Sequence, residues 1–230
     1  MSHRYEDVIA RAMLGLATTA SEHTTICTTL AELTAAAVQL IDGIDCANVL
    51  LIKDGEFYRV GSTSAIATAV DQAQERLGEG PCIDAAEQDV VIRCDDLRTD
   101  GRWPNFARAA RDAGVLRVMS YRLYTQGPNS GALNLFGFTP GSLTPEFEAV
   151  GAMLATHAAL AIIAADRQQQ FESALATRDL IGQAKGIIME RFDVDAIRAF
   201  QLLTRLSQES NTPVRVVAER LTRREKKSTV

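Results

Sequence analysis

Cysteine is the residue type in this sequence whose chemistry is most open to reaction. The chain contains Cys27, Cys46, Cys82 and Cys94, and no two of them have the spacing of a C-x-x-C pair or of a zinc site. We expect reduced cysteines that act as small buried hydrophobic residues. As an alternative, Cys82, which follows a Gly-Pro turn, and Cys94 could form a pair that responds to oxidants or nitric oxide.

Other catalytic arrangements are not indicated. The sequence has no nucleophile elbow, phosphate-binding loop, paired-histidine motif or dinucleotide-binding motif. Its three histidines, His3, His23 and His157, are too few and too scattered to place a catalytic dyad. We therefore do not expect an enzyme.

Charge is distributed unevenly along the chain. The whole sequence has a formal charge of −5, but residues 171–230 contain 11 basic and 8 acidic side chains, a net +3, which leaves −8 for residues 1–170. The basic end is a candidate surface for a polyanion, with an ordinary solvated helical unit as the alternative. The run Arg223-Arg224-Glu225-Lys226-Lys227 would add only nonspecific attraction to phosphates.

Length and composition predict a globular chain of two domains. The sequence has 230 residues, of which 47% are hydrophobic, enough for two cores. We find no run of about 18 apolar residues that would span a membrane. The N-terminus, with Arg4, Glu6 and Asp7, lacks a signal-peptide core. We expect a cytoplasmic protein.

Residues 177–222 are predicted to form three amphipathic helices. With residues placed at steps of about 100°, the middle helix groups its packing residues on one arc: Ala196, Ala199, Phe200, Leu203, Leu206 and Ser207. The first and third helices group Leu180, Ile181, Ala184, Ile187 and Ile188, and Val214, Val217, Ala218 and Leu221. Short connections predict a three-helix bundle, with N-caps at Asp195 and at Asn211 or Thr212, and Pro213 at the first position of the third helix.

This unit resembles a known family. The resemblance is carried by Ala184-Lys185-Gly186-Ile187-Ile188-Met189-Glu190-Arg191, Ala199-Phe200, Leu203, Arg205, Ser207-Gln208, Asn211 and Val217-Ala218. In this order and spacing the unit is similar to the ANTAR domain, which binds nascent RNA and causes transcription antitermination. The sequence departs from the family at Thr204, where a second arginine is common, at Pro213, where a basic residue is common, and at Val216, where an acid is common.

The resemblance implies a pair of small RNA hairpin loops as the target. Phosphates would meet Lys185, Arg191, Arg198, Arg205 and Arg215, with Arg220 as a further candidate, and bases would meet Ser207, Gln208 and Asn211. Arg191 falls on the apolar arc, so a structural role is its alternative. Phe192 and Phe200 could stack on bases, but Phe200 lies on the core arc and is expected to pack.

The preceding part of the chain predicts an α+β domain. Helical spacing is found at residues 5–16, 26–40, 65–77 and 102–113, and strands are expected at 47–52, 57–60, 90–92, 116–124 and 132–138. Residues 53–56 predict a β-hairpin turn, and residues 78–82 predict the end of the preceding helix. Helices that flank an antiparallel sheet of about five strands indicate an α+β fold.

This region resembles the GAF domain, a small-molecule sensor fold, over residues 21–165. The resemblance is carried by Gly78-Glu79-Gly80-Pro81-Cys82, Asp96-Leu97, Asp100, Arg102-Trp103-Pro104, Gly114-Val115, Ser120 and Gly131-Ala132-Leu133-Asn134-Leu135. Trp103 and Pro104 are expected to cap the domain structurally, with ligand stacking by Trp103 as the alternative.

The ligand and any cofactor stay unknown from the sequence. GAF domains bind cyclic nucleotides, haem, bilins, other molecules or nothing. A bilin needs a suitably placed cysteine and usually a neighbouring histidine, and the histidines are far along the chain from Cys82 and Cys94. Haem bound through His157 is conceivable, but a packed or surface histidine is favoured.

One helix is predicted to join the two domains. From Pro145 to Arg191 there is no proline, and glycine occurs only at Gly151, Gly182 and Gly186. An approximate heptad seam favours a parallel helical dimer, a homodimer through a coiled coil, over a short linker at residues 166–170. The seam comprises Phe147, Val150, Leu154, His157, Ala161, Ala164, Phe171 and Leu175.

The predicted organisation has five parts. They are an N-terminal helical segment (1–20), the GAF-like sensor (21–165), a helical linker (166–176), the ANTAR-like domain (177–223) and a basic tail (224–230). The function implied is a signal-responsive RNA-binding antitermination regulator. The alternatives are a DNA-binding regulator that uses a helix-turn-helix and a dimerisation module that binds no nucleic acid. A phosphorylated receiver is not indicated, because alternating strand and helix units with acidic strand ends are missing.

Overall fold

The computed structural model describes residues 25–53, 55–87, 90–123 and 130–225. It divides into two compact units, one ending at Ala165 and the other beginning at Asp166. Each unit is described by itself. The helix expected at residues 5–16, together with His3, His23 and most of the basic tail, lies outside the described residues.

The first unit is built on an antiparallel sheet. Among the described residues five strands pair in the order β2-β1-β5-β4-β3. They are β1 (Cys46–Lys53), β2 (Glu56–Val60), β3 (Val91–Cys94), β4 (Arg117–Leu123) and β5 (Ser130–Gly137). The expected α+β fold with an antiparallel sheet is confirmed, and each strand lies close to the segment that the sequence indicated.

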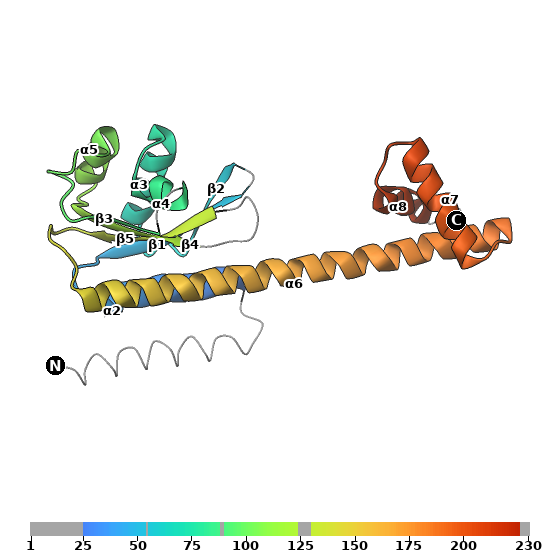
Figure 1. Ribbon diagram of the computed structural model, residues 1–230, viewed down its shortest axis with the longest axis horizontal. Coiled ribbons are helices and arrows are strands. Elements are labelled where there is room, and N and C mark those ends of the chain that lie inside the picture. The colour runs from blue at the N-terminus through green and yellow to red at the C-terminus, as the bar shows by residue number, and fades with distance from the viewer. Residues whose placement is uncertain (1–24, 54, 88–89, 124–129, 226–230) are drawn as a thin grey trace. The chain divides into compact units, whose positions relative to one another are not determined.

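Helices cover both faces of this sheet (Figure 1). One face carries α3 (Ala65–Leu77), α4 (Pro81–Glu87) and α5 (Pro104–Asp112), and the other carries α2 (Ile26–Leu40) and the first part of α6 (Pro145–Phe192). Alternate residues of a strand point to opposite faces, so β1 feeds two cores. Ala47, Val49 and Leu51 join the core beneath α2 and α6, whereas Cys46 and Leu50 join the core beneath α3, α4 and α5.

Sequence reasoning treated residues 78–82 only as a break and missed helix α4. Helix α3 does end at Gly78, which has φ of 64° and donates its N–H to Gln74 O at 2.9 Å. The chain then re-enters a helix at Pro81, a residue suited to a first helical turn. Seven residues are too few to display a helical repeat of apolar positions, so the pattern could not reveal α4.

Helix α6 is continuous over 48 residues, as predicted for the joining helix. The predicted dimer seam is wrong at its first three positions. Val150 and Leu154 are buried in the core of the first unit, and Phe147 packs against that core. An apolar repeat records that a helix face is covered but not what covers it, and here the covering element is the chain's own sheet.

Helix α6 also corrects the expectation about membrane spans. It contains an 18-residue window of mean hydropathy 1.7, long and apolar enough to cross a membrane by length and composition alone. Within the first unit its apolar residues include Ala155, Ala158 and Ile162, all of them buried against the core. Packing within the protein buries 39% of that window, and one such helix is a weak indication of a span.

The second unit contains the end of α6 with α7 (Ala196–Glu209) and α8 (Val214–Glu225). The three helices share a core of small and branched residues: Ala184, Ile188, Ala199, Leu203, Val217 and Ala218. Asp195 is the N-cap of α7, as predicted, and its side chain accepts a hydrogen bond from the N–H of Arg198 at 2.7 Å. The predicted three-helix unit is confirmed.

The cap predicted at Asn211 or Thr212 is wrong. Asn211 has φ of 46° and is the left-handed residue that ends α7, where the N–H of Thr212 donates to Ser207 O at 3.0 Å and that of Asn211 to Gln208 O at 3.2 Å. The Thr212 hydroxyl donates back to Ser210 O. Pro213 lies just before α8, which begins at Val214. Asparagine favours both helix ends, so the residue type could not choose between them.

The expected packing arc of α7 is also too broad. Ala199 and Leu203 are buried, but Phe200 is 45% exposed and Leu206 is 46% exposed. Two neighbouring helices cover only part of the α7 surface, so the outer residues of the apolar arc stay open to solvent. The prediction that Phe200 packs in the core is therefore wrong.

Candidate functional site

A row of polar side chains crosses the sheet of the first unit beneath α3. Asn48 on β1 pairs in register with Asn134 on β5, which pairs with Ser120 on β4. All three side chains have no exposed surface. The Ser120 hydroxyl donates to Asn134 Oδ1 at 2.8 Å, and Asn134 Nδ2 donates to Asn48 Oδ1 at 3.1 Å. Three polar residues thus form a chain in the middle of hydrophobic strands.

Helix α3 adds a carboxyl and an amide to this row. Asp71 Oδ1 accepts hydrogen bonds from Asn134 Nδ2 at 3.2 Å and from Gln74 Nε2 at 3.1 Å. Gln74 Oε1 in turn accepts from the backbone N–H of Cys82 in α4 at 2.9 Å. The polar cluster, defined as Asn48, Asp71, Gln74, Ser120 and Asn134, therefore connects the sheet, α3 and α4.

Burial sets the electrostatics of the polar cluster. Loss of solvent raises the pKa of Asp71 to about 7, against a lowering influence from the charge of Arg59 and from hydrogen bonds. Arg59 on β2 forms an ion pair with Glu75, one helical turn beyond Asp71. A buried carboxyl whose pKa is raised to about 7 is a candidate functional group.

Sequence reasoning did not select this cluster as a site. The available signal was an asparagine in the middle of each of two apolar strands, at Asn48 and Asn134. Asp71 carried no signal, because acids are common on helices and only the fold shows that it faces the sheet.

The sensor candidates Cys82, Cys94 and Trp103 are all buried in the core beneath α3, α4 and α5. Burial raises the pKa of the Cys82 thiol well above its usual value and that of Cys94 to about 12. Thiols held in this form are poor nucleophiles, so their environment favours the structural interpretation over a reactive pair. All four cysteines are free, and Cys27, expected to be buried, is exposed.

Trp103 has its polar and aromatic contacts within the protein. Its indole Nε1 donates to Asp84 Oδ2 on α4 at 2.9 Å. The Arg102 guanidinium lies 4.2 Å from the centre of the ring, and Phe106 meets it edge to face. These contacts agree with a structural cap more than with a ring that stacks on a ligand.

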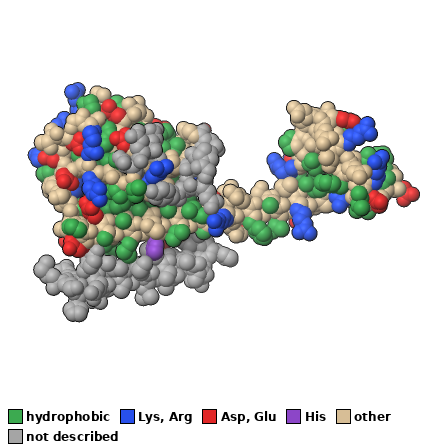
Figure 2. All heavy atoms as spheres, viewed as in Figure 1, with side chains coloured by type: hydrophobic (Ala, Val, Ile, Leu, Met, Phe, Trp, Pro, Cys, Tyr) green, Lys and Arg blue, Asp and Glu red, His purple; other side chains and the backbone are tan. Residues whose placement is uncertain are grey.

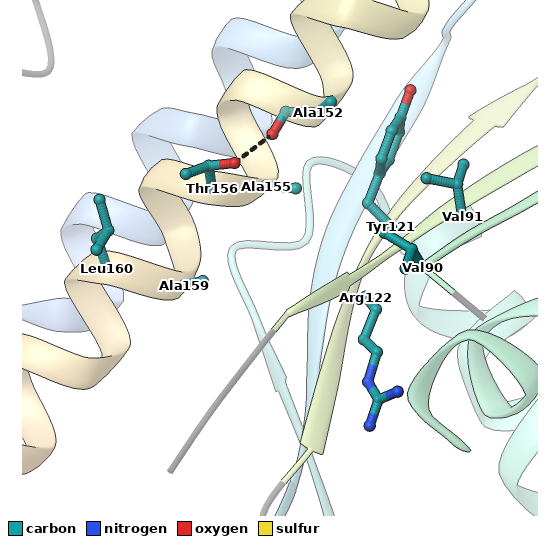
Figure 3. A pocket seen from close by; sticks show the side chains of 9 residues that line it. All are labelled: Val90, Val91, Tyr121, Arg122, Ala152, Ala155, Thr156, Ala159 and Leu160. Atoms are coloured by element: carbon teal, nitrogen blue, oxygen red, sulfur yellow. Dashed lines mark hydrogen bonds between the residues drawn. The ribbon is translucent and has the colours of Figure 1, made fainter. Parts of the chain in front are cut away.

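A shallow hollow of about 190 Å³ lies between α6 and the β3–β4 edge of the sheet (Figure 3). Its lining residues are mostly apolar: Val90, Val91, Tyr121, Arg122, Ala152, Ala155, Thr156, Ala159 and Leu160. The Tyr121 hydroxyl donates to Glu148 O at 3.0 Å, and the Thr156 hydroxyl donates to Ala152 O at 2.9 Å. Polar groups that could orient a substrate do not converge here, so the hollow is not a candidate active site.

The cations predicted for phosphate contact lie on all three helices of the second unit. Arg198, Arg205 and Arg215 are exposed, and Lys185 is half-buried. Arg198 Nη1 donates to Gln201 at 3.2 Å, and Arg205 forms an ion pair with Glu209 at 2.7 Å. Such exposed pairs are weak and can exchange for a phosphate partner. Figure 2 shows lysine and arginine side chains spread over this unit beside exposed hydrophobic ones.

The residues predicted to contact bases differ in their surroundings. Ser207 donates its hydroxyl to Thr212 O at 2.6 Å and so holds the α7–α8 loop. Gln208 and Asn211 are exposed at the same end of α7. Arg191 is exposed near the end of α6.

Exposed apolar side chains accompany these cations. Phe192 is 63% exposed, Ile197 72% and Phe200 45%. Sequence reasoning had named both phenylalanines as possible stacking residues, and their exposure leaves ring surface available for contact.

Metal binding is not indicated within the part of the chain that the structure describes. There, no group of three or more His, Cys, Asp and Glu side chains could hold an ion.

Each of the two units matches a known protein family. The GAF domain family matches residues 23–163, and the ANTAR domain family matches residues 169–221. The chain belongs to the GAF family and carries an ANTAR domain after it. Both are sensor or regulatory domains. The polar cluster therefore lies in the GAF domain, and the exposed arginines belong to the ANTAR domain.

Solved structures similar to the chain share the GAF fold. A GAF domain from a phosphoenolpyruvate-protein phosphotransferase of Coxiella burnetii has 16% identity and a TM-score of 0.53 over 72% of this chain and 96% of its own. The LuxR family transcription factor CepR2 of Burkholderia cenocepacia, described as dependent on N-acylhomoserine lactone, has 17% identity and a TM-score of 0.53 over 69% and 95%.

A further solved structure shares this fold. The reduced form of fRMsr of Staphylococcus aureus has 13% identity and a TM-score of 0.52 over 69% of this chain and 94% of its own. At these identities the likeness shows the fold alone. A search of curated proteins gave no significant match.

Proposed function

We propose that this GAF–ANTAR protein is a signal-responsive regulator that binds hairpin loops in nascent RNA and promotes transcription antitermination in the cytoplasm. The observation that supports RNA binding best is the exposure of arginines and aromatic rings on the same ANTAR domain. Phosphates are bound by cations, and unstacked loop bases are bound by aromatic rings, so the two together fit RNA loops. The protein has no catalytic role in this proposal.

The proposed contacts follow from the surroundings of each residue. Lys185, Arg191, Arg198, Arg205 and Arg215 bind phosphates. Gln208 and Asn211, exposed at the end of α7, offer hydrogen bonds to bases, whereas Ser207 orders the loop that carries Asn211.

The aromatic rings supply a further contact in this proposal. Phe192 and Phe200 stack on bases that a hairpin loop leaves unpaired. Stacking tolerates several base identities, so these rings contribute affinity, and the amides contribute sequence preference.

A homodimer is part of the proposal. Phe171 is 61% exposed and Leu175 43% exposed, one helical turn apart on α6. Large apolar side chains at this spacing form a helix–helix seam between two copies. A dimer presents two ANTAR domains, which matches a target with two hairpins.

A DNA-binding regulator is the second candidate, because a three-helix unit can place a helix in the major groove. Helix α8 would be the recognition helix and offers Arg215, Arg220 and Arg223. Arg223 is paired with Glu219 at 2.6 Å, and Glu219 puts an acid on the same helix. The exposed rings favour a single-stranded loop over duplex DNA.

The deciding experiment is a salt titration of full-length protein against a labelled two-hairpin RNA, a scrambled RNA and a duplex DNA of equal charge. We expect tighter binding to the two-hairpin RNA than to either control at every salt concentration. Equal and steeply salt-dependent binding to all three would leave only a basic surface and would contradict the proposal.

Alanine variants then test the surface residue by residue. Arg205→Ala should weaken binding of the two-hairpin RNA by about 1–3 kcal/mol, the range of a lost specific contact. Arg108→Ala is the matched control, because Arg108 is an exposed arginine on α5 of the GAF domain. Equal affinity of the two variants would remove the α7 surface from the RNA interface.

A further inference from the structure

Three buried side-chain atoms in the described part of the GAF domain lack hydrogen-bond partners. Within the described residues, the buried side-chain atoms without a partner are Arg59 Nε, Asp71 Oδ2 and Arg117 Nε. The first two come from neighbouring elements, because the Arg59 guanidinium on β2 forms an ion pair with Glu75, which lies one turn along α3 from Asp71. Buried polar groups are nearly always satisfied, so an orphan acceptor beside an orphan donor requires an explanation.

No hydrogen bond from the rest of the polar cluster reaches these two atoms. Asn134 Nδ2 donates to Asn48 and Asp71, and its Oδ1 accepts from Ser120. Asn48 Nδ2 donates a hydrogen bond to Ala67 O at 3.1 Å. Gln74 donates from Nε2 to Asp71 Oδ1 and accepts at Oε1 from the N–H of Cys82. The amides therefore fix Oδ1 of Asp71 and leave Oδ2 available.

We propose that Asp71 Oδ2 and Arg59 Nε bind a small uncharged molecule that carries an N–H group next to a carbonyl oxygen. This hydrogen-bonding edge is shared by lactams, cyclic ureas and pyrimidine bases. The N–H donates to Asp71 Oδ2 and the carbonyl accepts from Arg59 Nε. The inference rests on the proposed function, since it names the ligand class of the GAF sensor.

Charge argues for an uncharged ligand. An anion would be repelled by Asp71 in its ionised form, and a cation would be repelled by Arg59, whose outer nitrogen is held by Glu75. In a buried site neither repulsion is screened by water. A neutral edge with one donor and one acceptor satisfies both orphan atoms without adding charge.

The same contacts connect the proposed ligand site to Trp103, whose fluorescence can be measured. Gln74 joins Asp71 to the start of α4, and Asp84 of α4 accepts the indole N–H of Trp103. Trp103 is the single tryptophan of the chain, so its fluorescence reports on this part of the GAF domain. We therefore expect a ligand that hydrogen-bonds to Asp71 Oδ2 to change the fluorescence emission of Trp103.

The probe for this site is 2-pyrrolidinone, a lactam, added at millimolar concentration to the full-length protein. N-Methyl-2-pyrrolidinone is the matched control, because it keeps the carbonyl and lacks the N–H. Thermal denaturation and Trp103 fluorescence are measured with each compound. We expect 2-pyrrolidinone to raise Tm and change the fluorescence, and the methylated compound to bind about tenfold more weakly or worse, since it cannot donate to a charged acceptor.

The Asp71→Asn variant tests the named acceptor. Two N–H groups point at Oδ1, so the asparagine must place its own oxygen there and its NH₂ group where Oδ2 was. The site then offers a donor in place of an acceptor, and the preference for 2-pyrrolidinone over its methylated form should disappear. Asp112→Asn, a change of an exposed acid on α5, should leave the preference intact.

The pH dependence provides a second readout. The charged and titratable groups around Asp71 are Arg59 from β2, Glu75 on α3, and Cys82 and Asp84 on α4. Because the Asp71 pKa is raised to about 7, Oδ2 becomes protonated as the pH falls through that value and no longer accepts an N–H. Binding of 2-pyrrolidinone should therefore weaken from about pH 8 to about pH 6.

Several outcomes would overturn the inference. They are equal binding of the two compounds to the parent protein, absence of binding by both, and a preference that persists in Asp71→Asn. The comparison of compounds on the parent protein holds even where the variant fails to fold. No RNA is used, so a protein that binds the lactam but no RNA contradicts the proposed regulator and not the ligand site.

Discussion

At the scale of single residues, Asp71 shows how a fold changes the chemistry of an ordinary side chain. Its carboxyl lies under α3 among amides, and loss of solvent outweighs the favourable charge of Arg59. The same burial makes Cys82 and Cys94 poor nucleophiles. The same kind of burial therefore brings the pKa of a carboxyl close to neutral pH and keeps the thiols protonated and unreactive.

The raised pKa of Asp71 predicts a stability effect of definite sign. The pKa is about 7 in the folded chain against 3.8 as the reference value. Between about pH 4 and about pH 7 the folded chain keeps a proton that the unfolded chain has released. The contribution of Asp71 to the free energy of unfolding therefore falls as pH rises through this range, by up to about 4 kcal/mol.

Asp71→Asn should remove this contribution. In denaturant titrations followed by Trp103 fluorescence, the parent protein should lose stability relative to the variant as the pH rises from about 4 to about 7. Asp112→Asn serves as the control, as an exposed acid on α5. Parallel pH profiles for the parent and Asp71→Asn would show that Asp71 keeps an ordinary pKa.

At the scale of elements, the residues at the ends of the ANTAR helices determine where each helix stops and the next one begins. Helices α6 and α7 are followed by left-handed residues, Asp193 with φ of 47° and Asn211 with φ of 46°. These conformations turn the chain sharply and let three helices share a small core. The Asp195 cap then starts α7 two residues after the first of these turns.

Removing the α7 cap should loosen the start of that helix. Asp195→Ala deletes the acceptor for the N–H of Arg198, a hydrogen bond of 2.7 Å, and should cost about 1 kcal/mol of helix stability. Hydrogen exchange of the first-turn amides of α7 in the full chain measures this loss. Asp195→Asn retains a capping oxygen and should exchange much like the parent, and equal protection in all three proteins would show that the cap contributes little.

At the scale of the whole molecule, α6 belongs to both units. Its first part is core to the GAF domain, and its last part is core to the ANTAR domain. Between them Phe171 and Leu175 remain exposed. Exposed apolar side chains of this size mark a candidate interaction site, which the proposed dimer would use.

The proposed dimer is tested by making this stretch polar. The double variant Phe171→Ser, Leu175→Ser removes apolar surface from both partners and should raise the dimer dissociation constant by about tenfold or more. Sedimentation equilibrium measures that constant, with Gln169→Ser as the control on the same helix. A parent protein that is monomeric, or a double variant that dimerises as tightly as the parent, would rule out this seam.

The sequence by itself determined the local elements. Strand alternation, helical repeats and turn residues placed the strands, helices α2, α3, α5 and α6, and the bundle of the ANTAR domain. The exposed arginines could also be named, because charged side chains on an amphipathic helix face water. These features depend on residues close together along the chain, so a local pattern contains them.

Only the tertiary structure decided what covers each face and which distant side chains meet. Val150 and Leu154 have the spacing of a dimer seam and pack on the chain's own sheet, whereas Phe200 lies on an apolar arc and stays exposed. The cluster of Asp71 with Asn48 and Asn134 joins a helix to two strands far apart in sequence. The physical reason is that burial and hydrogen-bond partners are set by long-range packing, whereas periodicity records only that a face is apolar.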